Sequence, residues 1–480
     1  MRTPAASGRS TRFNRRALLQ RAGIATAGIA TGGVTLNALM PRVLPPAHAI
    51  DRNHSYWSLA LPDSNAPLAT AIDADIVVIG GGLTGLSTAC YLRQRLPGRR
   101  VVLLEAERCG NGASARNGAM LLTSTADRYL TAGSDPALDR RINELTVANI
   151  ATLRGLSQTV GVDAEIDLTG ALHVLLDDSG SEAAAATADR LRDNGIPVEH
   201  WDRERTAAAI GTHIYPGALF NPAAGQVHPG RLVALWKRAA EAAGVEIYEH
   251  SAVTQIEEGR THVLQTSTGH RVRTATLVLA TNAYGEQLGY LARAAAGVWD
   301  YVAITAPLSD AQVDALGWHS RAPYDDAHTE TFYLGITRDN RVHIGGGPVD
   351  YVFNGGVPDV ELQRRRHDSL QATLARLYPP LAGTGFEHRW AGLVDMSLDA
   401  SPALGSMGKY GNIFYAIAFS GHGVNLTSVF GRVLADLISG HGDDWRWLPY
   451  LNQLPPYVPN EPLRWLGIRA RLAAIRASEG

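Results

Sequence analysis

Cysteine and lysine are both scarce in this chain of 480 residues. The two cysteines, Cys90 and Cys109, cannot form a disulfide framework, and no C-x-x-C motif or cluster of cysteine and histidine has the spacing of a zinc site. We therefore expect both cysteines in the core or in turns, and we expect no metal site. Lysine occurs only at Lys237 and Lys409, so arginine carries almost all of the positive charge.

An excess of positive charge is also absent. The formal net charge is −2 and 19% of the residues are charged, so nothing indicates a nucleic-acid partner. Because 45% of the residues are hydrophobic, the chain is globular, and its length suffices for two domains or for one large intertwined domain.

Residues 1–49 have the pattern of an export signal. Arg15 and Arg16 precede a weakly apolar run rich in glycine, alanine and threonine, and the segment ends in Ala47-His48-Ala49, an A-x-A cleavage pattern. This pattern resembles a bacterial twin-arginine signal, which exports folded proteins to the periplasm or the exterior. The alternative is a basic tail followed by a membrane helix. The weak hydropathy of the apolar run argues against a membrane helix. The mature chain is expected to begin near Ile50.

A buried strand followed by a glycine-rich turn opens the mature fold. The apolar run 76–79 is typical of a parallel strand covered on both faces, and a helix over 86–96 and a second strand over 101–104 are predicted after it. Three glycines fill a G-x-G-x-x-G pattern between strand and helix: Gly80, Gly82 and Gly85. Glu105 follows the second strand about 20 residues past the last glycine, where a carboxylate meets a ribose hydroxyl. This order predicts a dinucleotide site, and a glycine-rich turn without a ligand is the alternative.

A second glycine-rich loop after Glu105 indicates which dinucleotide binds. It contains Gly112-Ala113-Ser114 and Arg116-Asn117-Gly118, with Ala119 where the motif E-x-x-x-x-x-x-G-A-S-x-R-N-G-G has its last glycine. This motif resembles the FAD-dependent amine and amino-acid oxidoreductases of the D-amino-acid oxidase superfamily, the DAO family. The resemblance spans nearly the whole mature chain and is closest to the γ-glutamylputrescine oxidase-like branch. It implies an α/β fold, with a FAD-binding Rossmann-like domain of the glutathione-reductase type and a mixed-sheet α+β substrate domain.

The resemblance also assigns residues to the FAD site. A turn at 420–423 breaks a strand-like run and opens a helix, and in such proteins it lies beside the pyrimidine edge of the flavin. An ordinary left-handed turn is the alternative. The residues expected to hold FAD are Gly80, Gly82, Leu83, Thr84, Gly85, Glu105, Ser114, Arg116, Asn117, Gly118, Val253, Thr281, Gly421, His422, Gly423 and Val424.

The predicted domains alternate along the chain. The FAD-binding domain is expected to comprise 73–125, 220–285 and 385–440, and the substrate domain 160–215 and 298–380. Residues 441–480 form a linker and a basic amphipathic helix. This helix either docks on its own protein or lies on a membrane surface.

The predicted substrate site lacks an arginine. The members of the family that bind α-amino acids are similar to glycine oxidase. In glycine oxidase a W-A-G-L-R element supplies an arginine that binds the substrate carboxylate. Here Trp390-Ala391-Gly392-Leu393 is followed by Val394 and Asp395, which resembles the branch whose substrates are amines. Asp395 is expected either to pair with a substrate ammonium or to cap a turn. Tyr333 and Trp390 are candidate pocket walls, with a place in the core as the alternative.

These features predict an amine oxidoreductase in which the flavin carries the chemistry. A neutral amine gives up hydride from carbon to the flavin, and water hydrolyses the resulting imine. The candidate catalytic residues are His422 and Asn117, and His422 acts through its field, as a proton relay or as a spacer. Arg116 stands where covalent relatives carry a histidine, so FAD is expected to bind non-covalently. Dioxygen or a membrane quinone is the expected electron acceptor.

Two other functions are compatible with the sequence. An amino-acid oxidase or dehydrogenase of the same fold needs a replacement arginine, for which Arg389 is the candidate. A catalytically silent flavoprotein, serving as a binding or assembly component, is the alternative from another class. Some amine oxidases use a lysine near the flavin to activate dioxygen, and neither Lys237 nor Lys409 is expected to lie there.

Overall fold

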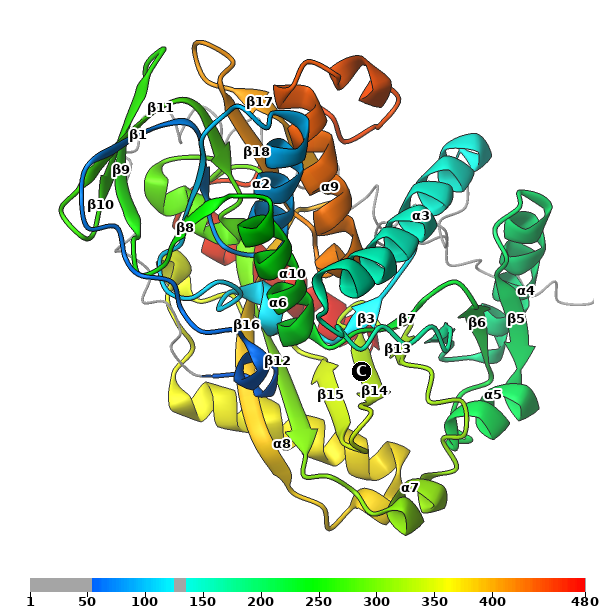
Figure 1. Ribbon diagram of the computed structural model, residues 1–480. Helices are drawn as coiled ribbons and strands as arrows, with labels where there is room; N and C mark the ends of the chain where they lie inside the picture. Colours follow the sequence, from blue (N-terminus) through cyan, green and yellow to red (C-terminus); the bar gives the residue numbers. More distant parts are fainter. Residues whose placement is uncertain (1–53, 125–134, 480) are drawn as a thin grey trace, which may run out of the picture.

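The computed structural model describes residues 54–124 and 135–479 (Figure 1). The predicted export signal lies outside these residues. Within them the chain forms two eight-stranded sheets, and the first with its helices occupies the upper half of Figure 1. A two-stranded sheet of β3 (Met120–Leu121) and β7 (Gly225–Gln226) completes the strand pairings.

The first sheet is parallel at its centre. Strand β1 (Ile72–Ile79) pairs in parallel with β2 on one side and β11 on the other, in the order β17-β18-β11-β1-β2-β8. Val77 and Val78 are fully buried, because helices or strands cover both faces, and this explains the uninterrupted apolar run. The other strands are β2 (Val101–Leu104), β8 (Glu246–Tyr248), β9 (Val253–Glu257), β10 (His262–Thr266), β11 (Arg271–Leu279), β17 (Ala403–Met407) and β18 (Ile413–Ile417).

Helices α2 (Leu83–Arg95) and α9 (Gly423–Ile438) follow two of these parallel strands and pack against each other. They approach closely at Gly431, where a Cβ atom would lie 2.1 Å from Oγ of Ser87. Since both helices follow strands of the same direction, their N-termini meet at one edge of the sheet. Helices α3 (Pro136–Val160) and α6 (Pro229–Ala242) complete this layer.

The second sheet has the order β16-β12-β15-β14-β13-β4-β6-β5 and is mixed, because β13 and β4 are parallel. Helix α8 (Val360–Leu377) covers one face, in the lower half of Figure 1. The opposite face of β12 carries Val302 and Ile304, which pack against the loop after β2. The strands are β4 (Ala171–Val174), β5 (Glu199–Asp202), β6 (Gly217–Asn221), β12 (Ala296–Thr305), β13 (Tyr324–Asp326), β14 (Phe332–Ile336), β15 (Val342–Gly346) and β16 (Phe386–Met396).

Two strands lie outside the domain boundaries that the sequence predicts. The segments 220–285 and 385–440 are expected in the FAD-binding domain, yet the end of β6 and all of β16 belong to the second sheet. The reason for β16 is its long ladder with β12, which pairs Ala296 with Met396 and Thr305 with Phe386. The W-A-G-L-V-D element therefore stands in the second sheet and faces the first.

Helix α10 (Leu463–Glu479) docks on the body of the protein. Arg464 pairs with Glu286 at 2.7 Å and Arg476 with Glu330 at 2.7 Å, while Trp465 and Ile468 pack on a buried apolar cluster. This contact agrees with the docking alternative, and the membrane contact stays a prediction. None of the helices in the described parts of the chain combines the length and hydropathy that crossing a membrane needs. The remaining helices are α4 (Asp178–Asp193), α5 (Arg203–Ile210) and α7 (Asp310–Leu316).

Candidate cofactor and active site

The glycine-rich turn after β1 has no room for side chains. Gly80 has φ +107°, and a Cβ atom there would lie 2.3 Å from the carbonyl oxygen of Ala280. A Cβ atom at Gly85 would lie 1.8 Å from the carbonyl oxygen of Gly80. Gly82 precedes α2 as its N-cap and offers no side-chain acceptor, while Oγ of Ser114 accepts from the Leu83 N–H at 2.9 Å. The turn therefore brings bare backbone and a helix N-terminus together, which suits a pyrophosphate.

Glu105 directly follows β2 at the same edge. Its Oε2 accepts from the Gly81 N–H at 2.6 Å and its Oε1 from the Glu107 N–H at 3.0 Å. Burial raises the pKa of this carboxyl group above its usual value. The Ser251 N–H donates to the carbonyl oxygen of Glu105 at 2.8 Å, which places the segment leading to β9 alongside. Val253 and Thr281, both half-buried, begin or follow strands at this edge.

The loop after Glu105 is shaped by its own side chains. Nδ2 of Asn117 donates to the carbonyl oxygens of Ala113 and Ser114, and its Oδ1 accepts from the Ala119 N–H at 3.0 Å. This geometry favours a loop-shaping role for Asn117 over the predicted catalytic one, because both ends of the amide are already bonded. Arg116 is buried and donates to the carbonyl oxygen of Ala391 at 2.9 Å. It links the loop to the second sheet.

Three side chains from outside the loop bond its consecutive carbonyl groups. Oγ of Ser55 donates to the carbonyl oxygen of Ala115. Nε1 of Trp390 donates to the carbonyl oxygen of Arg116 at 2.9 Å. Nε1 of Trp57 donates to the carbonyl oxygen of Asn117 at 2.9 Å. Ser55 and Trp57 belong to the N-terminal arm, residues 54–61, which includes the short helix η1 (Tyr56–Ala60). Sequence reasoning missed this arm. The aromatic pair at 56–57, close behind the predicted export signal, was the available clue.

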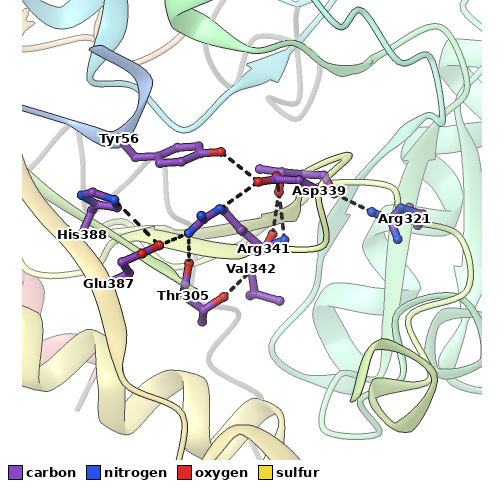
Figure 2. Close-up of polar contacts among 9 residues, drawn as sticks. Tyr56, Thr305, Arg321, Asp339, Arg341, Val342, Glu387 and His388 are labelled. Atoms are coloured by element: carbon purple, nitrogen blue, oxygen red, sulfur yellow. Dashed lines mark hydrogen bonds and ion pairs between the residues drawn. The ribbon is translucent and has the colours of Figure 1, made fainter. Parts of the chain in front are cut away.

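The outer side of the arm is fixed at the end of the second sheet (Figure 2). The hydroxyl group of Tyr56 donates to Asp339 at 3.1 Å, and its ring lies 4.9 Å from the guanidinium carbon of Arg341. Arg341 in turn pairs with Asp339 at 2.8 Å and with Glu387. The arm is thus held both at the cofactor loop and at a polar cluster of the second sheet.

The turn before α9 has an unusual backbone. Ala418, Ser420 and Gly421 all have positive φ angles, of 66°, 51° and 87°. Such strain at residues other than glycine is typical of functional sites. His422 is the N-cap of α9 without capping by its side chain, and its Nδ1 lies 3.1 Å from the carbonyl oxygen of Ser420. Because a carbonyl oxygen only accepts, Nδ1 carries the hydrogen, and Nε2 keeps its lone pair when the ring is neutral.

Asp395 lies beneath this turn and is 4% exposed. Its Oδ2 accepts from the Ala418 N–H at 2.6 Å, and its backbone carbonyl accepts from the Ser420 N–H at 3.1 Å. Burial raises the pKa of the carboxyl group to about 7. Of the two roles that the sequence leaves open, the structure therefore favours the turn-capping one, because the side chain is enclosed and already bonded.

Tyr333 and Trp390, the predicted pocket walls, differ in their surroundings. Trp390 is 1% exposed and packs in an apolar cluster, so it takes the core alternative. Tyr333 is half-buried, and its ring lies so close to the loop after Glu105 that a Cβ atom at Gly118 would be 2.3 Å from its Cε2. Its hydroxyl group donates to Oδ2 of Asp300 at 2.6 Å. Sequence reasoning missed Asp300, although a carboxylate inside the apolar strand 296–305 was a clue.

Neither lysine contacts these loops. Nζ of Lys237 forms a buried ion pair with Glu249 at 2.7 Å, and Lys409 is exposed in the turn between β17 and β18. Glu249 also accepts from the Cys109 N–H, and Lys237 donates to the carbonyl oxygen of Asp63 at 2.6 Å. The pair thus anchors the chain that follows the arm. Within residues 54–124 and 135–479, histidine, cysteine and carboxylate side chains form no group of three or more suited to a metal ion.

Comparison with known proteins identifies the family. The model of the DAO family, described as FAD dependent oxidoreductase, matches residues 75–437. The chain belongs to the DAO family. It is 30% identical over 419 residues to the γ-glutamylputrescine oxidoreductase of Escherichia coli K12, and the match covers 85% of this chain and 93% of that protein.

Solved structures confirm the predicted fold class. Glycine oxidase from Geobacillus kaustophilus matches with a TM-score of 0.68 at 22% identity, over 79% of this chain and 98% of that one. L-Proline dehydrogenase from P. horikoshii matches with a TM-score of 0.63 at 21% identity, over 77% of this chain and 94% of that one.

FAD is therefore the cofactor of this oxidoreductase, and the loops fit it. The glycine turn and the N-terminus of α2 suit its pyrophosphate, Glu105 suits the ribose hydroxyl groups, and the uncapped N-terminus of α9 suits the electron-rich edge of the flavin. The structure brings these three predicted segments to one edge of the first sheet. The individual contacts of the predicted FAD residues stay predictions.

Replacing Trp57 by phenylalanine tests the arm. The variant removes the Nε1–H donor to Asn117, and we expect the free energy of unfolding to fall by about 1–3 kcal/mol, because a buried carbonyl group loses its partner. We also expect FAD affinity to fall, because the loop loses one of its bonds. Urea unfolding and titration of the apoprotein with FAD measure the two effects.

Trp318→Phe is the matched control for this variant. Trp318 is also buried: its side chain is 2% exposed, and that of Trp57 is 1% exposed. Its Nε1 donates to the carbonyl oxygen of Ala322 at 3.0 Å in the core of the second sheet. It should lose similar stability and keep its FAD affinity. Wild-type FAD affinity in Trp57→Phe would contradict the role of the arm.

Asp395→Asn tests the buried carboxyl group. With a pKa of about 7 when folded, against about 4 when unfolded, Asp395 keeps a proton that the unfolded chain releases, so its contribution to stability falls as pH rises between these values. Asparagine still accepts from Ala418 and does not titrate. We expect Tm of the variant relative to wild type to rise between about pH 4 and about pH 7, measured on apoprotein. Asp399→Asn, at an exposed position, is the control, and a pH-independent difference for Asp395→Asn would refute the assignment.

Proposed function

We propose that this flavoenzyme oxidises the CH–NH bond of an amine, with FAD held non-covalently. FAD supplies the hydride acceptor, and the chain binds, orients and shields the substrate. The observation that carries the proposal is the residue at position 394. This chain has Val394 there, whereas the W-A-G-L-R element of the amino-acid-binding relatives has an arginine. A substrate carboxylate buried there would have no cationic partner, and such burial is costly.

Neither Arg116 nor Arg389 replaces the missing arginine. Arg116 is occupied by the carbonyl oxygens of Asn111, at 2.7 Å, and Ala391. Arg389, the replacement considered from the sequence, is exposed and lies over the ring of Phe386. Because side chains alternate along β16, Arg389 points away from the face that carries Trp390 and Val394. These positions favour an amine over an α-amino acid.

The turn before α9 supports the oxidation chemistry. The N-terminus of α9, with the N–H groups of Gly423 and Val424, suits negative charge at the neighbouring edge of the cofactor. Nε2 of His422, left with its lone pair, is the group in this turn that can take up a proton. The name of the Escherichia coli relative, a γ-glutamylputrescine oxidoreductase, agrees with an amine substrate. We propose dioxygen or a membrane quinone as the acceptor that reoxidises the flavin.

Anaerobic stopped-flow reduction of the flavin tests the substrate class. We expect each amine of a panel to reduce the flavin faster than its α-carboxylated analogue, because the analogue leaves a carboxylate unpaired. Val394→Arg is the complementary variant, and it should narrow or reverse this preference. Faster reduction by the carboxylated compounds would establish the amino-acid alternative. If neither the amines nor the carboxylated compounds reduce the flavin, the result would favour a catalytically silent flavoprotein that serves as a binding or assembly component.

We also propose export through the twin-arginine pathway, on the strength of Arg15, Arg16 and the A-x-A pattern alone. Changing Arg15 and Arg16 to lysine should leave folded, flavin-loaded protein in the cytoplasm. Lysine at Arg9 and Arg12 is the control, and this variant should still be exported. Fractionation of cells that express each variant measures the outcome, and export of the first variant would exclude this pathway.

A further inference from the structure

Asp300 stands at the centre of β12, on the face of the second sheet that meets the cofactor loop. Val302 and Ile304 share this face, since side chains alternate along a strand. Opposite Asp300 on β16 is Gly392, where a Cβ atom would lie 3.2 Å from Cβ of Arg116 in that loop. The absence of a side chain at Gly392 lets the loop approach this strand closely beside Asp300, which is half-buried.

The carboxylate of Asp300 is held by neutral donors. Oδ2 accepts from the hydroxyl group of Tyr333 at 2.6 Å, Oδ1 from the Tyr301 N–H at 2.8 Å, and the Gly346 N–H donates to the same carboxylate. Tyr333 in turn lies against Gly118 of the loop. The carboxylate is therefore fixed in position beside the segment that borders the cofactor.

No arginine, lysine or histidine of residues 54–124 and 135–479 pairs with Asp300. Its neighbour in the same sheet region, Asp350, shows the usual arrangement, because Arg366 pairs with it at 2.7 Å. Burial raises the pKa of Asp300 to about 6, so the group is largely ionised at neutral pH. A half-buried anion without a counter-ion gains from a cationic ligand.

We propose that Asp300, oriented by Tyr333, binds a second ammonium group of the substrate, so that the amine oxidised is of the diamine class. This inference rests on the proposed amine oxidation. The reacting nitrogen must be neutral, because its lone pair forms the C=N bond as the adjacent carbon loses hydride. A carboxylate stabilises the protonated form instead, so Asp300 suits the nitrogen that does not react. Asp395, which the sequence suggested for this role, is enclosed beneath its turn and cannot take it.

The test compares diaminobutane with butylamine, which has the same chain length and one nitrogen. Anaerobic flavin reduction against concentration gives an apparent Kd and a limiting rate for each. For Asp300→Asn we expect the Kd of diaminobutane to rise by about tenfold or more, because a charge-assisted bond is lost, and that of butylamine to change by less than about twofold. Asp300→Glu keeps the charge and should keep the preference for the diamine.

Tyr333→Phe is the second variant, and it carries the test if Asp300→Asn does not fold. It leaves the carboxylate and removes its orienting hydroxyl group, so the preference for diaminobutane should fall by a smaller factor. Equal effects of the variants on both amines, or a wild-type enzyme that prefers butylamine, would overturn the role of Asp300 and leave amine oxidation standing. A wild-type flavin that neither amine reduces would overturn the proposed function and this inference with it.

Discussion

The hydrogen bonds to the carbonyl groups of residues 115–117 join the two sheets at the cofactor site. Trp390 comes from the second sheet and Trp57 from the N-terminal arm, while the loop itself continues from β2 of the first sheet. Each bond satisfies a carbonyl group in a closely packed region, where an unpaired one costs about 1–3 kcal/mol. The position of the cofactor loop, and of the face of the second sheet above it, depends on all three partners.

Three carboxyl groups near the site have different surroundings and different roles. Glu105 is bonded by two backbone N–H groups where the FAD ribose is predicted, Asp395 is enclosed beneath a strained turn, and Asp300 is half-buried beside the loop. All three have neutral donors, and burial raises the pKa of each. One chemical group thus supports a backbone turn at Asp395, is predicted to bind the cofactor at Glu105 and, as we propose, recognises substrate at Asp300, and its environment decides which.

The parts of the site that the sequence predicts well are those formed by neighbouring residues. Gly80, Gly82, Gly85 and Glu105 lie within one strand-helix-strand unit, so their spacing alone indicates their geometry. The place of Asp395 could not be predicted, because it depends on the contact between β16 and the turn after β18. Asp300 becomes visible only through its register opposite Gly392, and the arm only through its contact with the loop. Contacts between segments that are far apart in the chain leave no local pattern in the sequence from which they could be predicted.

The scarcity of lysine has a consequence for chemical attachment. Lys237 is 2% exposed and engaged with Glu249, so Lys409 is the one lysine side chain that an amine-reactive reagent reaches in the folded chain. Lys409 lies in the turn that leads into β18, whereas the turn before α9, predicted to face the flavin, follows the other end of that strand. A molecule immobilised through Lys409 therefore presents its cofactor edge away from the support, in a single orientation.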